Sequence, residues 1–135
     1  MIKQLRVPVS GQGLHEMTAR VATEVADSGL SDGLCTLFIQ HTSASLLIQE
    51  NADPSARADL ESWLNRLVPE NDPLYTHVFE GADDMPAHIK SMLTATTLSI
   101  PIMGRRLALG TWQGIYLWEH RYYNGDRNCV LHMTD

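Results

Sequence analysis

The chain has 135 residues, a length typical of a single domain that buries about two thirds of its unfolded surface. A hydrophobic content of 44%, with 9 Gly and 6 Pro, excludes the disordered and fibrous classes. The net charge of -6, without any run of Lys or Arg, argues against a protein that binds nucleic-acid phosphates, although one or two Arg suffice for a small phosphorylated ligand. No apolar run is long enough for a membrane span, and the N-terminus lacks the apolar run of a signal peptide.

The first half of the chain predicts three strands and two helices. Alternating apolar residues predict the strands, helical spacing of apolar residues predicts the first helix, and Gly29 ends it. Asp53 and Pro54 predict the start of the second helix, because an N-cap carboxylate followed by proline is a typical helix beginning. The expected elements are a strand at 2–9, a helix at 14–26, strands at 34–40 and 45–50 that could form a hairpin, and a helix that ends before Pro69.

The second half predicts a loop over 70–82, a third helix and four short strands. The helix begins near Asp83 and carries His88. Asn124-Gly125 is the strongest hairpin signal of the chain. The four strands are expected at about 98–102, 106–110, 112–121 and 127–134. Strands outnumber helices, so the predicted class is α+β with a largely antiparallel sheet or sandwich and about three helices, in one domain over 1–135.

Cys35 and Cys129 fall inside predicted strands without the CxxC spacing of a redox or metal motif. We expect two free, buried thiols in a reducing cytoplasm, with a disulfide between them as the less favoured alternative.

In several predicted strands, the apolar side chains that share one face of the strand are followed by a polar residue at the strand end. His41 follows an apolar row, Glu50 ends another, and Gln113 and Glu119 bound the row between them. Each is either a strand end that reaches the surface, or a residue that enters a site. A hydrogen-bonded core histidine is the structural alternative for His41.

A further polar segment runs from His77 to His88. Asp84 and His88 are four residues apart, so at a helix start they can meet on one face. A carboxylate with imidazoles is typical of a general base with its orienting partner, or of metal ligands. The alternative is that Asp84 caps the helix and His88 lies on the surface.

Distance limits how these residues combine. Gln113 and Glu119 are separated by six residues of strand, roughly 20 Å. If residues 34–41 and 45–50 form a hairpin, His41 and Glu50 are separated by a similar span. One small pocket in a single chain cannot hold all of them, so a neighbouring subunit would have to contribute. The row Trp112, Tyr116 and Trp118 is a candidate interface, with core packing as its alternative.

Four segments give the chain its resemblance to the YjbQ family, whose members are also described as secondary thiamine-phosphate synthase enzymes. These segments, in order along nearly the whole chain, are His41-Thr42-Ser43-Ala44-Ser45, Gln49 to Pro54, Glu80 to Lys90, and Gly110-Thr111-Trp112-Gln113-Gly114-Ile115. The resemblance implies an α+β homotrimer with polar pockets near the subunit contacts. It also implies a weak thiamine-phosphate synthase activity, which joins hydroxymethylpyrimidine pyrophosphate to thiazole phosphate and releases pyrophosphate.

The leading hypothesis is therefore a cytoplasmic transferase acting on a small phosphorylated metabolite, with a divalent ion such as Mg or Zn bridging the pyrophosphate. Two alternatives stay open, a metal-dependent hydrolase or lyase and a non-catalytic trimeric metabolite-binding protein. The expected catalytic residues are His41, His77, Asp84 and His88; those for ligand binding are Glu50, Asn51, Gln113 and Glu119; and those for metal are His41, His77 and His88.

Overall fold

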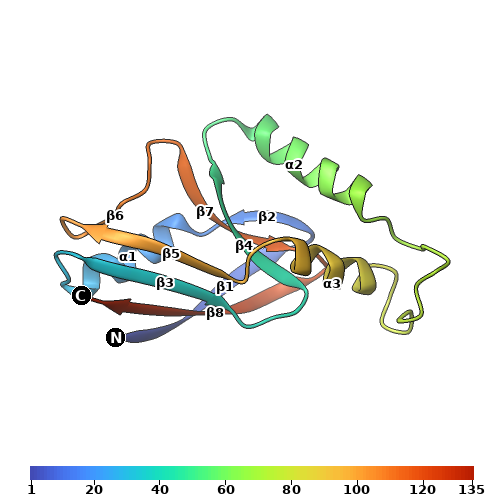
Figure 1. Cartoon of the computed structure of the whole chain (residues 1–135), viewed down its shortest axis with the longest axis horizontal. Coiled ribbons are helices and arrows are strands. Elements are labelled where there is room, and N and C mark those ends of the chain that lie inside the picture. Colours follow the sequence, from blue (N-terminus) through green and yellow to red (C-terminus); the bar gives the residue numbers. More distant parts are fainter.

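The computed structural model describes all 135 residues and contains eight strands and three helices (Figure 1). In chain order these are β1 (Ile2–Ser10), β2 (Gly13–Glu16), α1 (Thr18–Ser28), β3 (Gly33–Ile39), β4 (Ala44–Glu50), α2 (Pro54–Leu67), α3 (Asp84–Leu93), β5 (Thr97–Met103), β6 (Arg106–Leu107), β7 (Gln113–Glu119) and β8 (Asn124–Thr134).

The strands form two antiparallel sheets. The larger has the order β1-β8-β3-β5-β6 and the smaller has the order β2-β7-β4. All pairings are antiparallel. The predicted α+β class with largely antiparallel sheets and three helices is therefore confirmed.

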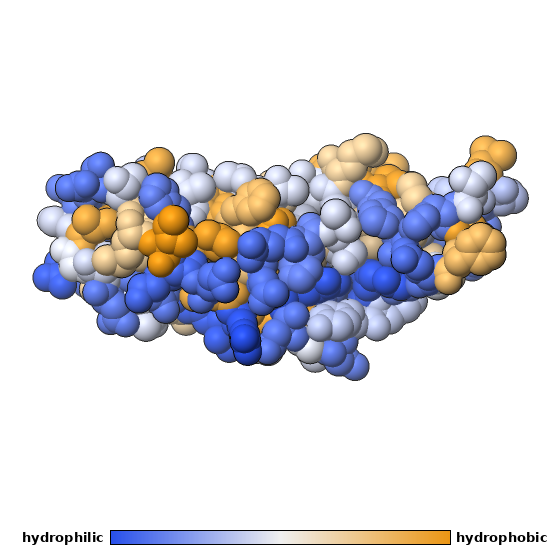
Figure 2. Space-filling view, turned by 90° about the horizontal axis from the view of Figure 1, so that it is seen from below, coloured by the Kyte–Doolittle hydropathy of each residue, from blue (hydrophilic) through white to orange (hydrophobic).

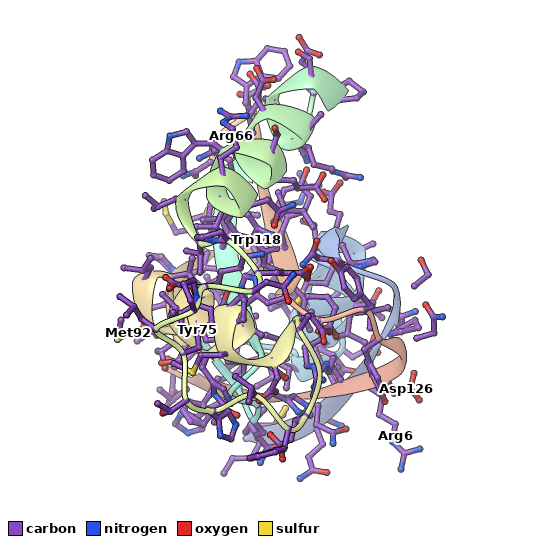
Figure 3. The ribbon with its side chains drawn as sticks, turned by 90° about the vertical axis from the view of Figure 1, so that its right-hand side faces the viewer. Arg6, Arg66, Tyr75, Met92, Trp118 and Asp126 are labelled. Atoms are coloured by element: carbon purple, nitrogen blue, oxygen red, sulfur yellow. The ribbon has the colours of Figure 1, made fainter.

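Two apolar clusters hold the layers together. The main core lies between the two sheets and includes Val7, Leu37, Leu117 and Leu131, all 2% exposed or less. A second cluster lies on the other face of the smaller sheet, where Trp118 packs with Leu64 of α2 and other apolar residues. Figure 3 shows Trp118 between α2 and α3. The smaller sheet is thus covered on both faces, which explains why six of the seven residues of β7 are buried.

Three sequence expectations were wrong, two of them because strands neighbouring in sequence belong to different sheets. β3 and β4 do not form a hairpin, because β3 pairs with β5 and β8 while β4 pairs with β7. Asn124-Gly125 is no hairpin turn, because it begins β8 and Gly125 pairs with Val9. The segment predicted as one helix over 14–26 is divided, since residues 13–16 form strand β2.

Helix α2 lies at the margin of the molecule, and Figure 1 shows it extending away from the sheets. It begins as predicted: the Asp53 carboxylate accepts a hydrogen bond from the Ser55 N–H at 2.9 Å, and Pro54 is its first residue. Only Leu64 is fully buried, while Trp63 is 55% and Leu67 is 52% exposed. Two of the large apolar residues of α2 are therefore open to solvent.

The surface is mixed in character. Figure 2 shows apolar residues among hydrophilic ones, both over the sheet half of the molecule and at the end where the loop of residues 68–83 lies. None of the three helices has the length and apolarity that crossing a bilayer requires.

Candidate functional site: a histidine and carboxylate cluster

Four side chains converge where the loop of residues 68–83 enters α3. His77, Glu80, Asp84 and His88 each offer one ligand atom, and these four atoms lie within 4.8 Å of one another. The Asp84 Oδ2 atom is 2.9 Å from His77 Nε2 and 3.3 Å from His88 Nε2. His77 Nε2 also lies 3.0 Å from Glu80 Oε2. The predicted grouping of His77, Asp84 and His88 is thus present, and Glu80 joins it.

Helix geometry explains this convergence. Asp84 is the first residue of α3 and His88 follows one turn later, so the two side chains share a face. The loop then folds back to bring His77 against them, with the two imidazole centroids 5.4 Å apart. Asp84 is buried, whereas His77, Glu80 and His88 remain partly open to solvent.

Arg121, just after β7, fixes this loop to the sheet. Its Nη1 atom is 3.1 Å from Asp84 Oδ1, and its Nε atom is 3.2 Å from Asp83 Oδ2. Nη2 donates to the Glu80 carbonyl oxygen at 2.5 Å. Burial alone would raise the pKa of Asp84, but hydrogen bonding with neighbouring Glu80 and His77 and the charges of His88 and Arg121 hold it below its ordinary value. Asp84 therefore faces the imidazoles as a carboxylate.

A second polar group lies beyond Arg121. Glu119 is fully buried and receives hydrogen bonds from Arg127 Nε at 2.5 Å and Nη2 at 2.6 Å. The Glu119 carboxylate also accepts the Arg121 N–H at 3.1 Å. A pocket of about 480 Å³, lined by Ser43, Asp83, Arg121, Arg127 and two tyrosines, lies where the two groups meet.

His41 belongs to this second group and not to the histidine and carboxylate cluster, so the expectation that it joins His77 and His88 at a metal is not met. Its Nε2 atom accepts the Asn128 N–H at 2.8 Å, and Nδ1 lies 3.2 Å from Arg127 Nη1. Burial and the Arg127 charge lower the pKa of His41, so the ring is held neutral. Its Nε2 lone pair is occupied by a backbone donor.

Three predicted ligand-binding residues lie at the other end of β7. Gln113 pairs with Glu50, whereas Glu119 pairs with Ala44 six residues further along. The Gln113 Oε1 atom accepts the Gly110 N–H at 2.8 Å, and Asn51 donates to Glu16 at 3.0 Å. The conclusion that Gln113 and Glu119 cannot share a pocket within one chain agrees with this register.

Sequence reasoning missed Glu80, Arg121 and Arg127. Glu80 could have been found from its spacing of three from His77 and four from Asp84. The two arginines gave no such signal. The side-chain partners of Arg121 are 37 or more residues away, and those of Arg127 lie on β7 and in the connection between β3 and β4. In the row offered as an interface, with core packing as its alternative, Tyr116 and Trp118 are core residues and only Trp112 is exposed.

Proteins with this sequence pattern are known in several bacteria. A UPF0047 protein of Synechocystis is 49% identical over 130 residues, covering 96% of this chain and 88% of the relative. The UPF0047 protein YjbQ of Escherichia coli O157:H7 is 44% identical over 129 residues, covering 95% and 93% of the two chains.

Solved structures agree with the fold. A conserved hypothetical protein from Thermus thermophilus superposes with a TM-score of 0.88 at 33% identity, covering 98% of this chain and 99% of that one. An uncharacterized conserved protein from Clostridium acetobutylicum gives a TM-score of 0.85 at 35% identity, with 99% of both chains covered. The family model described as UPF0047 protein YjbQ-like matches residues 3–135. The chain therefore belongs to the YjbQ-like UPF0047 family.

Proposed function

We propose that this protein is a metal-dependent enzyme for a small phosphorylated metabolite, and that His77, Glu80, Asp84 and His88 hold the ion. The observation that carries the proposal is the convergence of their four ligand atoms within 4.8 Å. Ligands at 2.0–2.2 Å from one ion lie at most about 4.4 Å apart, so small side-chain shifts complete the coordination. A bound ion would supply a Lewis acid that polarises a phosphate oxygen or lowers the pKa of a water molecule.

The donor set favours zinc or a similar transition metal over magnesium. Two imidazole nitrogens and two carboxylate oxygens suit Zn²⁺, whereas Mg²⁺ prefers oxygen ligands and retains several waters. Arg121 holds Asp84 from the far side, an outer contact of the kind that orients metal ligands. This donor set supports the hydrolase or lyase reading, in which the site activates water.

The pocket beside the cluster supports a phosphorylated substrate. Arg121 and Arg127 both line it, and the Ser43 hydroxyl adds a neutral donor. Guanidinium groups bind phosphate oxygens in paired geometry. This is the observation that favours the second candidate, the thiamine-phosphate synthase reaction expected from the family resemblance, because the departing pyrophosphate needs such cations.

Metal analysis and turnover test the proposal together. Protein stripped with chelator should regain one equivalent of Zn²⁺ by calorimetry, and the Asp84→Asn and His88→Ala variants should lose that binding. His132→Ala, which alters an exposed histidine on β8, should bind like wild type. Failure of every divalent ion to bind the wild-type protein would contradict the proposal.

Assays on the same protein preparation distinguish the synthase reaction from the hydrolase reaction. The preparation is assayed for coupling of the two thiamine precursors, with thiamine phosphate and pyrophosphate as products, and for phosphate release from the pyrophosphate precursor alone. Coupling lost in the Asp84→Asn variant would support the synthase. Phosphate release without coupling would support the hydrolase.

We also propose that the working unit is a homotrimer in the cytoplasm. The open face of α2, with Trp63 and Leu67 four residues apart, supports association. A groove of about 600 Å³ lies between this helix and Gln49 near the end of β4, an edge strand of its sheet. Two free, buried cysteines fit a reducing compartment.

A further inference from the structure

A pocket on a different face of α3 contains a buried lysine without an acidic partner. Lys90 is 3% exposed, and its amine nitrogen makes one hydrogen bond, to Asn65 Oδ1 at 2.5 Å. No carboxylate oxygen lies within 4.0 Å of this nitrogen, the distance limit for a salt bridge. Lysines are almost never fully buried unless they are paired with an acid. The nitrogen therefore has N–H donors without partners.

The pocket that Lys90 lines has a volume of about 330 Å³. Its other walls include Glu70, Tyr122, and the apolar Val68 and Pro69. The Tyr122 hydroxyl donates to Glu70 Oε2 at 2.6 Å, while Glu70 Oε1 makes no protein hydrogen bond. The pocket thus has a nitrogen donor on one wall, a carboxylate acceptor on another, and apolar surface contributed by Val68 and Pro69.

This pocket is separate from the histidine and carboxylate cluster. Lys90 follows Asp84 by six residues, or about 600° of helix rotation, so it projects from a different face of α3. None of the four cluster residues lines the pocket. Tyr122 lines both this pocket and the pocket of about 480 Å³ that Arg121 and Arg127 line, called the arginine pocket below, so it links the two regions.

The charges select the kind of ligand. A phosphate or dicarboxylate would pair with Lys90 but would meet the Glu70 carboxylate at close range. A simple cation would pair with Glu70 and leave the lysine donors unsatisfied. A molecule with a carboxylate at one end and an ammonium at the other satisfies both walls. We infer that this pocket binds a small zwitterion of the α-amino-acid class, with its carboxylate on Lys90 and its ammonium on Glu70.

Three probes with one apolar body test the inference. L-valine carries both charged ends, 3-methylbutanoate lacks the ammonium, and isobutylamine lacks the carboxylate. Chemical shifts of ¹⁵N-labelled protein are followed as each probe is titrated to about 10 mM, a range that captures weak binding. L-valine should move the signals around Val68 and Tyr122 and saturate, and each one-ended probe should bind roughly tenfold more weakly or worse, because a charged hydrogen bond is lost.

Variants locate the binding. Glu70→Gln and Lys90→Met should each raise the Kd for L-valine about tenfold or more, for the same loss of a charged hydrogen bond. The chain has one other lysine, Lys3, which is exposed on β1, so Lys3→Met is the matched control and should bind like wild type. Glu70→Gln alters a side chain that is not fully buried, so it keeps the test decisive if Lys90→Met fails to fold.

Two results would overturn the inference. One is a one-ended probe that binds as tightly as L-valine, and the other is the absence of saturable shifts with all three probes. Protein stripped of metal should bind L-valine unchanged, so the result does not depend on whether the proposed metal site is correct.

Discussion

At the scale of single residues, the most informative feature of this protein is its buried charged side chains. Glu119 is fully buried and Arg127 is 8% exposed, and the two are joined by two hydrogen bonds. Such a pair is costly to bury but far more costly to break, because removing one partner leaves the other charged and unpaired. Arg127 also contacts His41 and Ser43, and with Ser43 it forms part of the wall of the arginine pocket.

Breaking this pair should destabilise the fold strongly. Arg127→Met leaves the Glu119 carboxylate without its guanidinium, and we expect the free energy of unfolding to fall by about 3–5 kcal/mol. The double variant Arg127→Met with Glu119→Gln should recover part of this loss, since it removes the isolated charge. Urea denaturation measures both. Equal stability of the single variant and wild type would contradict this role.

His120 should make stability depend on pH. Burial, with the charges of Lys90 and Arg127, lowers the pKa of His120 to about 3, and its Nδ1 atom has no hydrogen-bond partner. The unfolded histidine takes up a proton below about pH 6.5 while the folded one does not. The free energy of unfolding is therefore not reduced by His120 above about pH 6.5. Below that pH it falls as the pH decreases, by up to about 1.4 kcal/mol per pH unit.

Unfolding of the His120→Gln variant between about pH 6.5 and about pH 4.5 checks this expectation, because this window lies below the unfolded pKa and above the folded one. The slope of stability against pH should be smaller than in wild type, although His41, whose pKa is also lowered, keeps some of it. Asp83 and Asp84 have lowered pKa values as well, but they lose their contribution at lower pH, near and below about 4. An unchanged slope in the variant would contradict the assignment to His120.

At the scale of elements, the start of each helix shows how local sequence places functional groups. The Asp53 cap and Pro54 fix the first turn of α2, and the acidic start of α3 places Asp84 where the loop of residues 68–83 returns. The first cap serves stability, because its carboxylate satisfies a backbone N–H that would lack a partner.

Replacing the α2 cap should have a modest and local effect. Asp53→Ala removes the hydrogen bond to the Ser55 N–H, and we expect a loss of about 1 kcal/mol in unfolding free energy. Asp27→Ala, at an exposed position on α1, serves as the control and should stay within about 0.5 kcal/mol of wild type. Thermal unfolding followed by circular dichroism compares the two, and an equal loss in both would rule out the capping explanation.

At the scale of the whole molecule, helix α2 has apolar surface that the rest of the chain does not cover. Its contacts with the body depend on Leu64 and a few half-buried neighbours, and its outer apolar residues have no partner within the chain. An exposed Trp and Leu four residues apart form an apolar patch of the kind that marks an interaction site, and such a patch supports the proposed trimer.

Charges placed on this face should dissociate the proposed trimer. Light scattering of wild-type protein should give three times the chain mass of 15.1 kDa, and the double variant Trp63→Glu with Leu67→Glu should move toward monomer. Leu74→Glu, which alters a loop side chain that is 86% exposed, should leave the mass unchanged. A monomeric wild type would refute the trimer directly.

The sequence by itself determined the fold class, the cap of α2, the buried unpaired cysteines and the grouping of His77, Asp84 and His88. Each of these depends on periodicity, composition or contacts between residues close in the chain. The tertiary structure decided the separation of β3 from β4, the replacement of His41 by Glu80 in the cluster, and the roles of Arg121 and Arg127. These depend on which strands pair across the two sheets, and local sequence carries no direct record of pairings between residues far apart in the chain.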